Sequence, residues 1–147
     1  MPIPELDAGT GYLPPGVHDA TWDELVEVFA FNSGRVELLQ GFRNALESLA
    51  RAGCKRAYLD GSFVTAKQDP SDFDGCWETA GVDPTLLDPE LLDFREGRAA
   101  QKARYGGELF LANAAADPAG TAFLDFFQGD REGRPKGIVA IDPGALS

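Results

Sequence analysis

The sequence predicts a single α/β (α+β) domain, with helices near the start of the chain and short strands after them. Residues 38–49 carry apolar side chains at the 3.6-residue spacing of a helix. Four later apolar stretches have the length and composition of strands, at 56–60, 72–77, 108–112 and 137–141. A chain of 147 residues can bury one core but is short for two. We therefore expect a Pro- and Gly-rich extended arm at 1–17 and one domain at 18–147.

Two helices are indicated by residues that favour helix starts. Thr21 and Glu24 have the spacing of a capping box, so a short helix is expected to run from there to Phe29. A longer helix is expected to begin at Asn32 or Ser33, since both side chains can accept a hydrogen bond from the first turn.

Gly53 is placed to end the second helix in a left-handed conformation, and the pattern after it becomes extended. Arg56–Asp60 and Asp72–Trp77 are expected to form neighbouring antiparallel strands, joined through a Gly61-Ser62 turn and a brief helical turn. Residues 79–97 are expected to form short helical turns packed by leucines. The remaining expected elements are a basic helix at Gly97–Tyr105, a strand at Glu108–Ala112, an aromatic helix at Thr121–Gln128 and a strand at Gly137–Ile141.

The composition argues against several functional classes. The formal net charge of −11 opposes unaided binding to nucleic acid, which requires a basic surface. No apolar stretch is long enough to span a bilayer and the first residues lack the features of a signal peptide, so we expect a cytoplasmic protein. Cys54 and Cys76 are expected to be buried free thiols, and with one histidine they are too few for a structural zinc site.

The residues that can carry chemistry lie around the second predicted strand. Asp72 and Asp74 are spaced i and i+2, which directs both carboxylates to one face of a strand. Gly61 and Ser62 precede them and form a turn whose backbone amides and hydroxyl can face phosphates. Paired carboxylates opposite such a turn are suited to a magnesium nucleotide. The sequence therefore predicts Mg²⁺-dependent nucleotidyl transfer, with ATP as the expected triphosphate.

A third carboxylate normally completes a site of this kind. Glu108 is the first candidate for a third magnesium ligand or general base, because it opens a predicted strand directly after two glycines. Asp93 and Asp125 are the competing candidates. Basic side chains are also needed near the triphosphate, and Lys102 is preferred for this role. The other basic candidates are Lys67, Arg98 and Arg104.

The pattern of Gly61-Ser62 with Asp72-Phe73-Asp74 resembles the motif of the DNA polymerase beta-like nucleotidyltransferase superfamily, in its minimal single-domain form. A wider pattern resembles a small bacterial family of uncharacterised nucleotidyltransferase-like proteins and covers nearly the whole chain. Its segments are Leu13-Pro14-Pro15-Gly16, Phe31-Asn32, Asp60-Gly61-Ser62-Phe63-Val64-Thr65, Tyr105-Gly106-Gly107-Glu108, Phe126-Phe127-Gln128 and Lys136-Gly137-Ile138.

The resemblance implies the nucleotidyltransferase fold, a small mixed β-sheet flanked by helices. Similar proteins include antibiotic-modifying enzymes and the nucleotidyltransferase halves of toxin–antitoxin pairs. Two features depart from the superfamily pattern: Glu108 stands where Asp is more usual, and Gly75-Cys76-Trp77 replaces the apolar residues expected after the paired acids.

Three functions are compatible with these residues. The first is an enzyme that moves a nucleoside monophosphate from a nucleoside triphosphate to a hydroxyl on a protein or small molecule. The second is a non-catalytic, antitoxin-like module that retains the fold and neutralises a toxin-like partner through its acidic surface. The third, modification of a cationic aminoglycoside, ranks last because the chain has no evident substrate domain.

Overall fold

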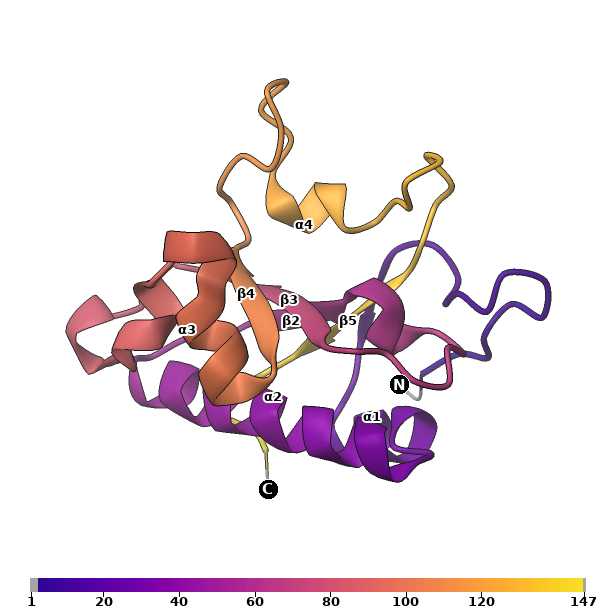
Figure 1. Cartoon of the computed structure of the whole chain (residues 1–147), viewed down its shortest axis with the longest axis horizontal. Helices are drawn as coiled ribbons and strands as arrows, with labels where there is room; N and C mark the ends of the chain where they lie inside the picture. The colour runs from indigo at the N-terminus through magenta and orange to yellow at the C-terminus, as the bar shows by residue number, and fades with distance from the viewer. Residues whose placement is uncertain (1–2, 147) are drawn as a thin grey trace.

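The structure is a computed structural model that describes residues 3–146, and its centre is a five-stranded mixed sheet with helices on both faces (Figure 1). The order across the sheet is β1-β5-β2-β3-β4. β1 is parallel to β5 and β3 is parallel to β4, whereas β2 is antiparallel to both of its neighbours. The α/β class expected from the sequence is confirmed. The strands are β1 (Val17–Asp19), β2 (Ala57–Asp60), β3 (Phe73–Trp77), β4 (Gly107–Leu111) and β5 (Ile138–Ile141).

The expected helix starts are confirmed. Thr21 caps α1 and forms a capping box with Glu24, and Asn32 caps α2 by accepting from the backbone N–H of Arg35. Gly53 follows α2 with a φ of 94°, in the left-handed region. The helices are α1 (Trp22–Phe29), α2 (Ser33–Arg51), α3 (Arg95–Tyr105) and α4 (Phe123–Phe126), with short 3₁₀ helices η1 (Gly61–Val64), η2 (Pro84–Leu86) and η3 (Pro89–Leu92).

The alternation of side chains along the strands divides the core between the two faces of the sheet. One face packs against α1, α2 and α3, and this larger cluster includes Leu59, Phe73 and Leu109. The opposite face carries a smaller cluster that includes Tyr58 and Cys76 and packs against residues of α4. Figure 1 shows α1 and α2 on one side of the sheet, α4 on the other, and α3 beside β4. The residues of β2, β3 and β4 that share a face with Tyr58 and Cys76 therefore face the side of α4.

Three elements differ from the expectation. The end of the expected arm forms β1, a strand with only three residues that is held by pairing with β5. α4 begins at Phe123 rather than Thr121 because Ala122 pairs with Ala115 in extended conformation. α3 contains a left-handed turn at 96–98, so regular helix starts later than expected.

Cys54 and Cys76 are buried free thiols, as expected, and they belong to the clusters on opposite faces of the sheet. Across residues 3–146, no helix combines the length and apolar character needed to cross a membrane. Residues 1 and 2 of the expected arm, and residue 147 of the expected domain, lie outside the described residues.

Candidate functional site

Carboxylates from three strands meet at one end of the sheet. The register pairs Asp60 of β2 with Asp74 of β3, and Asp74 with Glu108 of β4. Residues directly opposite on neighbouring strands project to the same face, which here is the face of α4. Asp72 immediately precedes β3. We call Asp60, Asp72, Asp74 and Glu108 the acidic cluster.

The acidic cluster is electrostatically coupled. Burial, together with the charges of Asp72 and Glu108, raises the pKa of Asp74 to about 6. Burial and the charge of Glu108 also raise the pKa of Asp72. The structure thus brings together the three carboxylates that the sequence analysis selected, Asp72, Asp74 and Glu108.

Glu108 already has two cationic partners. Its Oε2 accepts from the Nε of Arg98 at 3.0 Å, and its Oε1 lies 2.7 Å from the Nζ of Lys102. Burial acts in the opposite direction, but these two hydrogen bonds lower the pKa of Glu108. Lys102, which was expected to contact a triphosphate, is therefore held by Glu108 at the edge of the acidic cluster.

The two competing candidates for the third carboxylate lie elsewhere. Asp93 accepts two hydrogen bonds from the guanidinium of Arg95, at 2.9 and 2.8 Å, and these bonds lower its pKa to about 2. Asp125 is exposed on α4. Of the three candidates, only Glu108 is in register with Asp74.

The turn at Gly61 lies against the acidic cluster. Gly61 opens η1 with a φ of 72°, and a Cβ built on it would lie 2.7 Å from Oδ2 of Asp74. Glycine is therefore required both for the backbone conformation and for the approach of the Asp74 carboxylate. Ser62 follows and lines a cavity of about 430 Å³ together with Thr65, Lys67 and other residues. The turn and the paired acids are neighbours, as the nucleotide hypothesis requires.

A buried arginine forms hydrogen bonds to the backbone of the segment that contains this turn. Arg35 of α2 is 0% exposed, and its guanidinium lies between the rings of Phe31 and Phe63, 4.2 and 4.6 Å from their centroids. Among residues 3–146 it donates to four backbone carbonyls, and three of these belong to the segment that contains η1. The acceptors are the carbonyl oxygens of Phe29, Phe63, Thr65 and Lys67.

Asp60 is the most unusual member of the acidic cluster. Its side chain is 0% exposed, and neither of its carboxylate oxygens has a hydrogen-bond partner among the described residues. Burial, followed by the charge of Asp74, raises its pKa well above the usual value. A buried carboxyl without a partner carries a large desolvation cost, so this residue requires an explanation.

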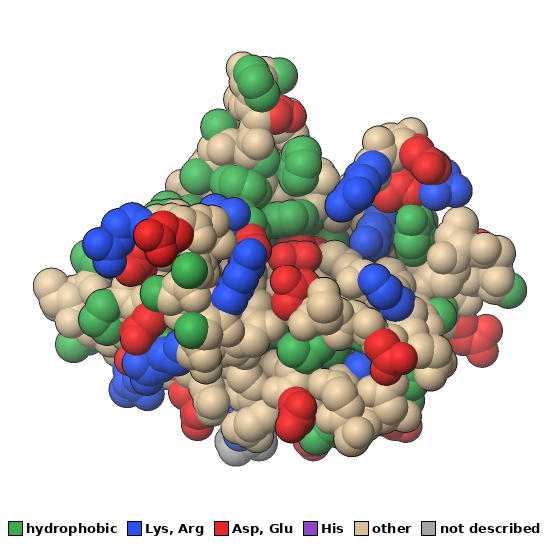
Figure 2. Space-filling view, in the orientation of Figure 1, with side chains coloured by type: hydrophobic (Ala, Val, Ile, Leu, Met, Phe, Trp, Pro, Cys, Tyr) green, Lys and Arg blue, Asp and Glu red, His purple; other side chains and the backbone are tan. Residues whose placement is uncertain are grey.

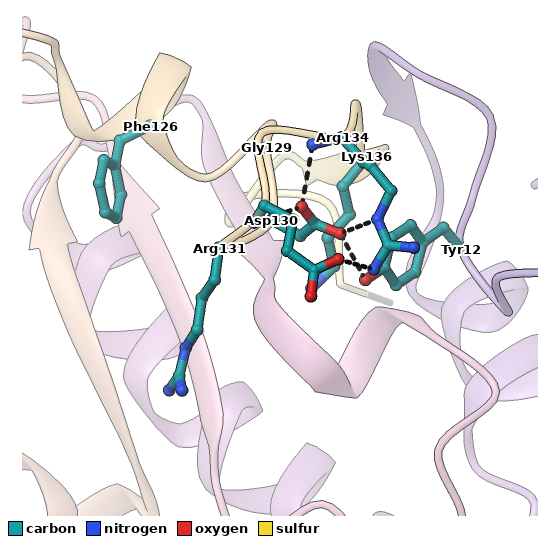
Figure 3. A pocket seen from close by; sticks show the side chains of 8 residues that line it. Tyr12, Phe126, Gly129, Asp130, Arg131, Arg134 and Lys136 are labelled. Atoms are coloured by element: carbon teal, nitrogen blue, oxygen red, sulfur yellow. Dashed lines mark hydrogen bonds and ion pairs between the residues drawn. The ribbon is translucent and has the colours of Figure 1, made fainter.

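Two cavities meet near the acidic cluster at Tyr12 and Lys136. The larger has a volume of about 740 Å³ and lies between Phe126 and the loop that leads into β5 (Figure 3). The loop is closed by Asp130, which accepts from the hydroxyl of Tyr12 at 2.9 Å and from Nε of Arg134 at 2.8 Å. Figure 2 shows acidic side chains below a hollow between the α4 segment and this loop.

Lys136 lines both cavities and is the basic residue that approaches the acidic cluster from the side of β5. Its ammonium lies 5.2 Å from the ring centroid of Tyr12. Burial lowers the pKa of Lys136, and its positive charge offsets part of the rise in the pKa of Asp60 and Asp74. A cation is therefore held at the boundary between the acidic cluster and the cavity that Ser62 lines.

Within residues 3–146, no group of three or more Asp, Glu, His or Cys side chains is arranged so that it could bind a metal ion. The assignment of Asp72, Asp74 and Glu108 to magnesium therefore stays a prediction. Both oxygens of Glu108 are paired with Arg98 and Lys102.

Three residues of this region were not selected from the sequence. Asp60 was recognised only as part of the motif before Gly61, although an Asp at the end of an apolar strand is itself a signal. Lys136 was named only within the wider family-like pattern, as part of Lys136-Gly137-Ile138, and no chemical role was assigned to it. Arg35 lies on the predicted second helix, where an arginine is normally solvated.

The fold and the site define a mixed α/β protein with an acidic cluster at one end of its sheet, next to a glycine-dependent turn. A family model described as "Family of unknown function (DUF6932)" matches residues 4–142, so the chain belongs to this family. No curated protein and no solved structure matches the chain.

Proposed function

We propose that this protein is a Mg²⁺-dependent nucleotidyltransferase. It would move a nucleoside monophosphate from a nucleoside triphosphate, with ATP as the first candidate, to a hydroxyl on a protein or small molecule. The observation that carries the proposal is the meeting of the acidic cluster with the turn at Gly61 and Ser62. The same end of the sheet thereby offers anionic groups for a cation and donors for phosphates.

We assign phosphate binding to the turn at Gly61 and Ser62 and to the cavity that Ser62 lines. Ser62, Thr65, Lys67 and Lys136 line this cavity, and their hydroxyl and ammonium groups are suited to phosphate oxygens. Lys102 is 48% exposed and Arg98 is 26% exposed, so both can still reach a departing pyrophosphate while paired with Glu108. Their positive charges would stabilise the charge that develops on the leaving group.

The carboxylates of Asp72 and Asp74 would hold Mg²⁺. Nucleotide-bound Mg²⁺ usually takes one or two protein carboxylates and completes its coordination with phosphate oxygens and water, so a three-carboxylate cage is not required. The unpartnered carboxyl of Asp60 beside Asp74 supports a cation at this end of the sheet. When bound, the ion would neutralise phosphate charge and activate the attacking hydroxyl. The lowered pKa of Glu108 makes it a weak general base, so we assign it the positioning of Arg98 and Lys102.

The test is nucleotidyl transfer by matched aspartate variants. The protein is incubated with α-labelled ATP, CTP, GTP or UTP, Mg²⁺ and a set of protein and small-molecule acceptors, and covalent label is measured. Asp74→Asn should abolish transfer, whereas Asp69→Asn, at an exposed position outside the acidic cluster, should retain it. Label that is equal in wild type and Asp74→Asn would reject this site.

The antitoxin-like module remains the second candidate, and the engagement of Glu108 favours it. A carboxylate whose two oxygens are held by Arg98 and Lys102 is not free for catalysis, and the net charge of −11 suits a basic partner. Calorimetry with Mg²⁺ and each nucleotide separates the two functions. An interaction module should show no Mg²⁺-dependent nucleotide affinity, while an enzyme should show affinity that Asp74→Asn weakens.

A further inference from the structure

We propose that Asp60 and Asp74 form the core of a divalent-cation site, and that Asp60 takes the place expected of Glu108. The inference deepens the proposed function, because it concerns the same end of the sheet. It assigns a ligand that the motif does not include.

The first argument is the state of Asp60. Its carboxyl is fully buried and lacks a partner for either oxygen among residues 3–146. An asparagine or an apolar residue would fill this position at a lower desolvation cost. A proton would remove the charge but would leave the second oxygen without a donor, whereas a divalent cation can be shared by the oxygens of two carboxylates.

The second argument is the direction of the Asp74 side chain. Oδ2 of Asp74 lies 2.7 Å, and its Cγ 3.4 Å, from the position that a Cβ on residue 61 would take. The register sets Asp74 directly opposite Asp60 on β2. The carboxylate of Asp74 therefore packs against the end of β2, and the glycine provides the room for it.

The third argument is that Glu108 is engaged elsewhere. Both oxygens of Glu108 are paired with cations, at 3.0 and 2.7 Å. Asp72 acts on Asp74 through its charge and remains available as a further oxygen ligand, as in the proposed function. The carboxyl of Asp60 has no partner among the described residues, so the pair on β2 and β3 has oxygen atoms that a cation could take. Lys136 is the basic residue that faces this pair, and it acts on both carboxyls.

The ligand class follows from these groups. Two carboxylates without nitrogen or sulfur ligands favour a hard divalent cation such as Mg²⁺, Mn²⁺ or Ca²⁺. Water and, in the proposed reaction, phosphate oxygens would fill the remaining coordination positions. The site needs no third protein carboxylate, consistent with the geometry of the described residues.

Mn²⁺ binding to the full chain without nucleotide tests the inference. Free Mn²⁺ is followed by electron paramagnetic resonance for wild type, Asp60→Asn, Asp60→Ala, Glu108→Gln and the control Asp69→Asn. Both Asp60 variants should bind Mn²⁺ at least about tenfold more weakly, since even outer-shell changes at metal sites cost about 10–100-fold. Asp69→Asn should stay within about threefold of wild type, and Glu108→Gln should lose less affinity than either Asp60 variant. Circular dichroism checks the fold, and Asp60→Asn should be at least as stable as wild type in the presence of a chelator.

Three outcomes overturn the inference: wild type that binds no Mn²⁺ at millimolar concentration, Asp60 variants with wild-type affinity, or loss of affinity in Glu108→Gln alone. The result is separable from the proposed function. Mn²⁺ binding without any nucleotidyl transfer removes the function and leaves the cation site. Nucleotidyl transfer with unchanged Mn²⁺ affinity in Asp60→Asn removes the cation site and leaves the function.

Discussion

Replacing Arg35 with methionine should lower the free energy of unfolding by several kcal/mol and loosen the turn at Gly61. The side chain is fully buried and donates hydrogen bonds to four backbone carbonyls. Methionine preserves much of the apolar volume of the stem but supplies no donor. The acceptors, most of them in and after η1, would then lose their partners.

The magnitude follows from the buried acceptors. The carbonyls of Phe29, Phe63 and Thr65 lie in buried surroundings, and a hydrogen bond to a charged group is worth about 1.5–3 kcal/mol. Removal of the guanidinium also removes the cost of burying its charge, which offsets part of this loss. We expect a net loss of about 3–5 kcal/mol, comparable to breaking other buried charged contacts. For a chain of this size, that corresponds to a fall in Tm of about 10 °C.

Urea denaturation and thermal unfolding followed by circular dichroism give the global effect. Hydrogen exchange measures the local effect, and the amides of residues 61–67 should lose protection most. Arg35→Lys retains the charge but not the planar fork, so it should fall between methionine and wild type. Arg131→Met, at an exposed arginine, is the control and should change stability by less than about 0.5 kcal/mol. A loss below about 1 kcal/mol in Arg35→Met, with unchanged protection at 61–67, would refute the reasoning.

Three further predictions concern other groups. Gly61→Ala should lower the free energy of unfolding by about 1–2 kcal/mol, because Gly61 has a left-handed φ and a Cβ would press on Oδ2 of Asp74; urea denaturation equal to wild type would contradict this. The folded-state pKa of Asp74 is raised from 3.8 to about 6, so its stabilising contribution is present below about pH 4 and is lost as pH rises through about 6. Asp74→Asn should flatten the pH dependence of unfolding in that window, and an unchanged profile would count against the raised pKa. Cys54 and Cys76 are buried and burial raises the pKa of both thiols, so a thiol reagent should label neither in the native protein and both in urea; fast labelling of the native protein would argue against this packing.

Local chemistry explains which parts of the fold were predictable. The capping box at Thr21 and the cap at Asn32 act within one helical turn, so the sequence marks them directly. β2 and β3 were also predicted correctly as antiparallel neighbours, because a short turn region joins two apolar stretches. β1 was missed because a three-residue strand has no periodicity, and it depends on pairing with a distant segment.

The candidate site was predictable only to the level of its motif. The spacing of Asp72 and Asp74 indicated a common face, and the structure does bring Glu108 beside them. Glu108 forms ion pairs with Arg98, which lies in the left-handed turn at 96–98, and with Lys102, and no residue pattern specified either the turn or the pairs. The environment of Asp60 depends on the register of β2 with β3, which sets Asp60 opposite Asp74. Partners set by tertiary register are not encoded in short spacings.

The pairing of β1 with β5 has a consequence for synthesis. Val17 is synthesised well before its partner Ile138. The first strand therefore has no partner in the sheet until β5 has been synthesised. Long-range pairings of this kind slow folding, so the edge formed by β1 and β5 is expected to be completed late.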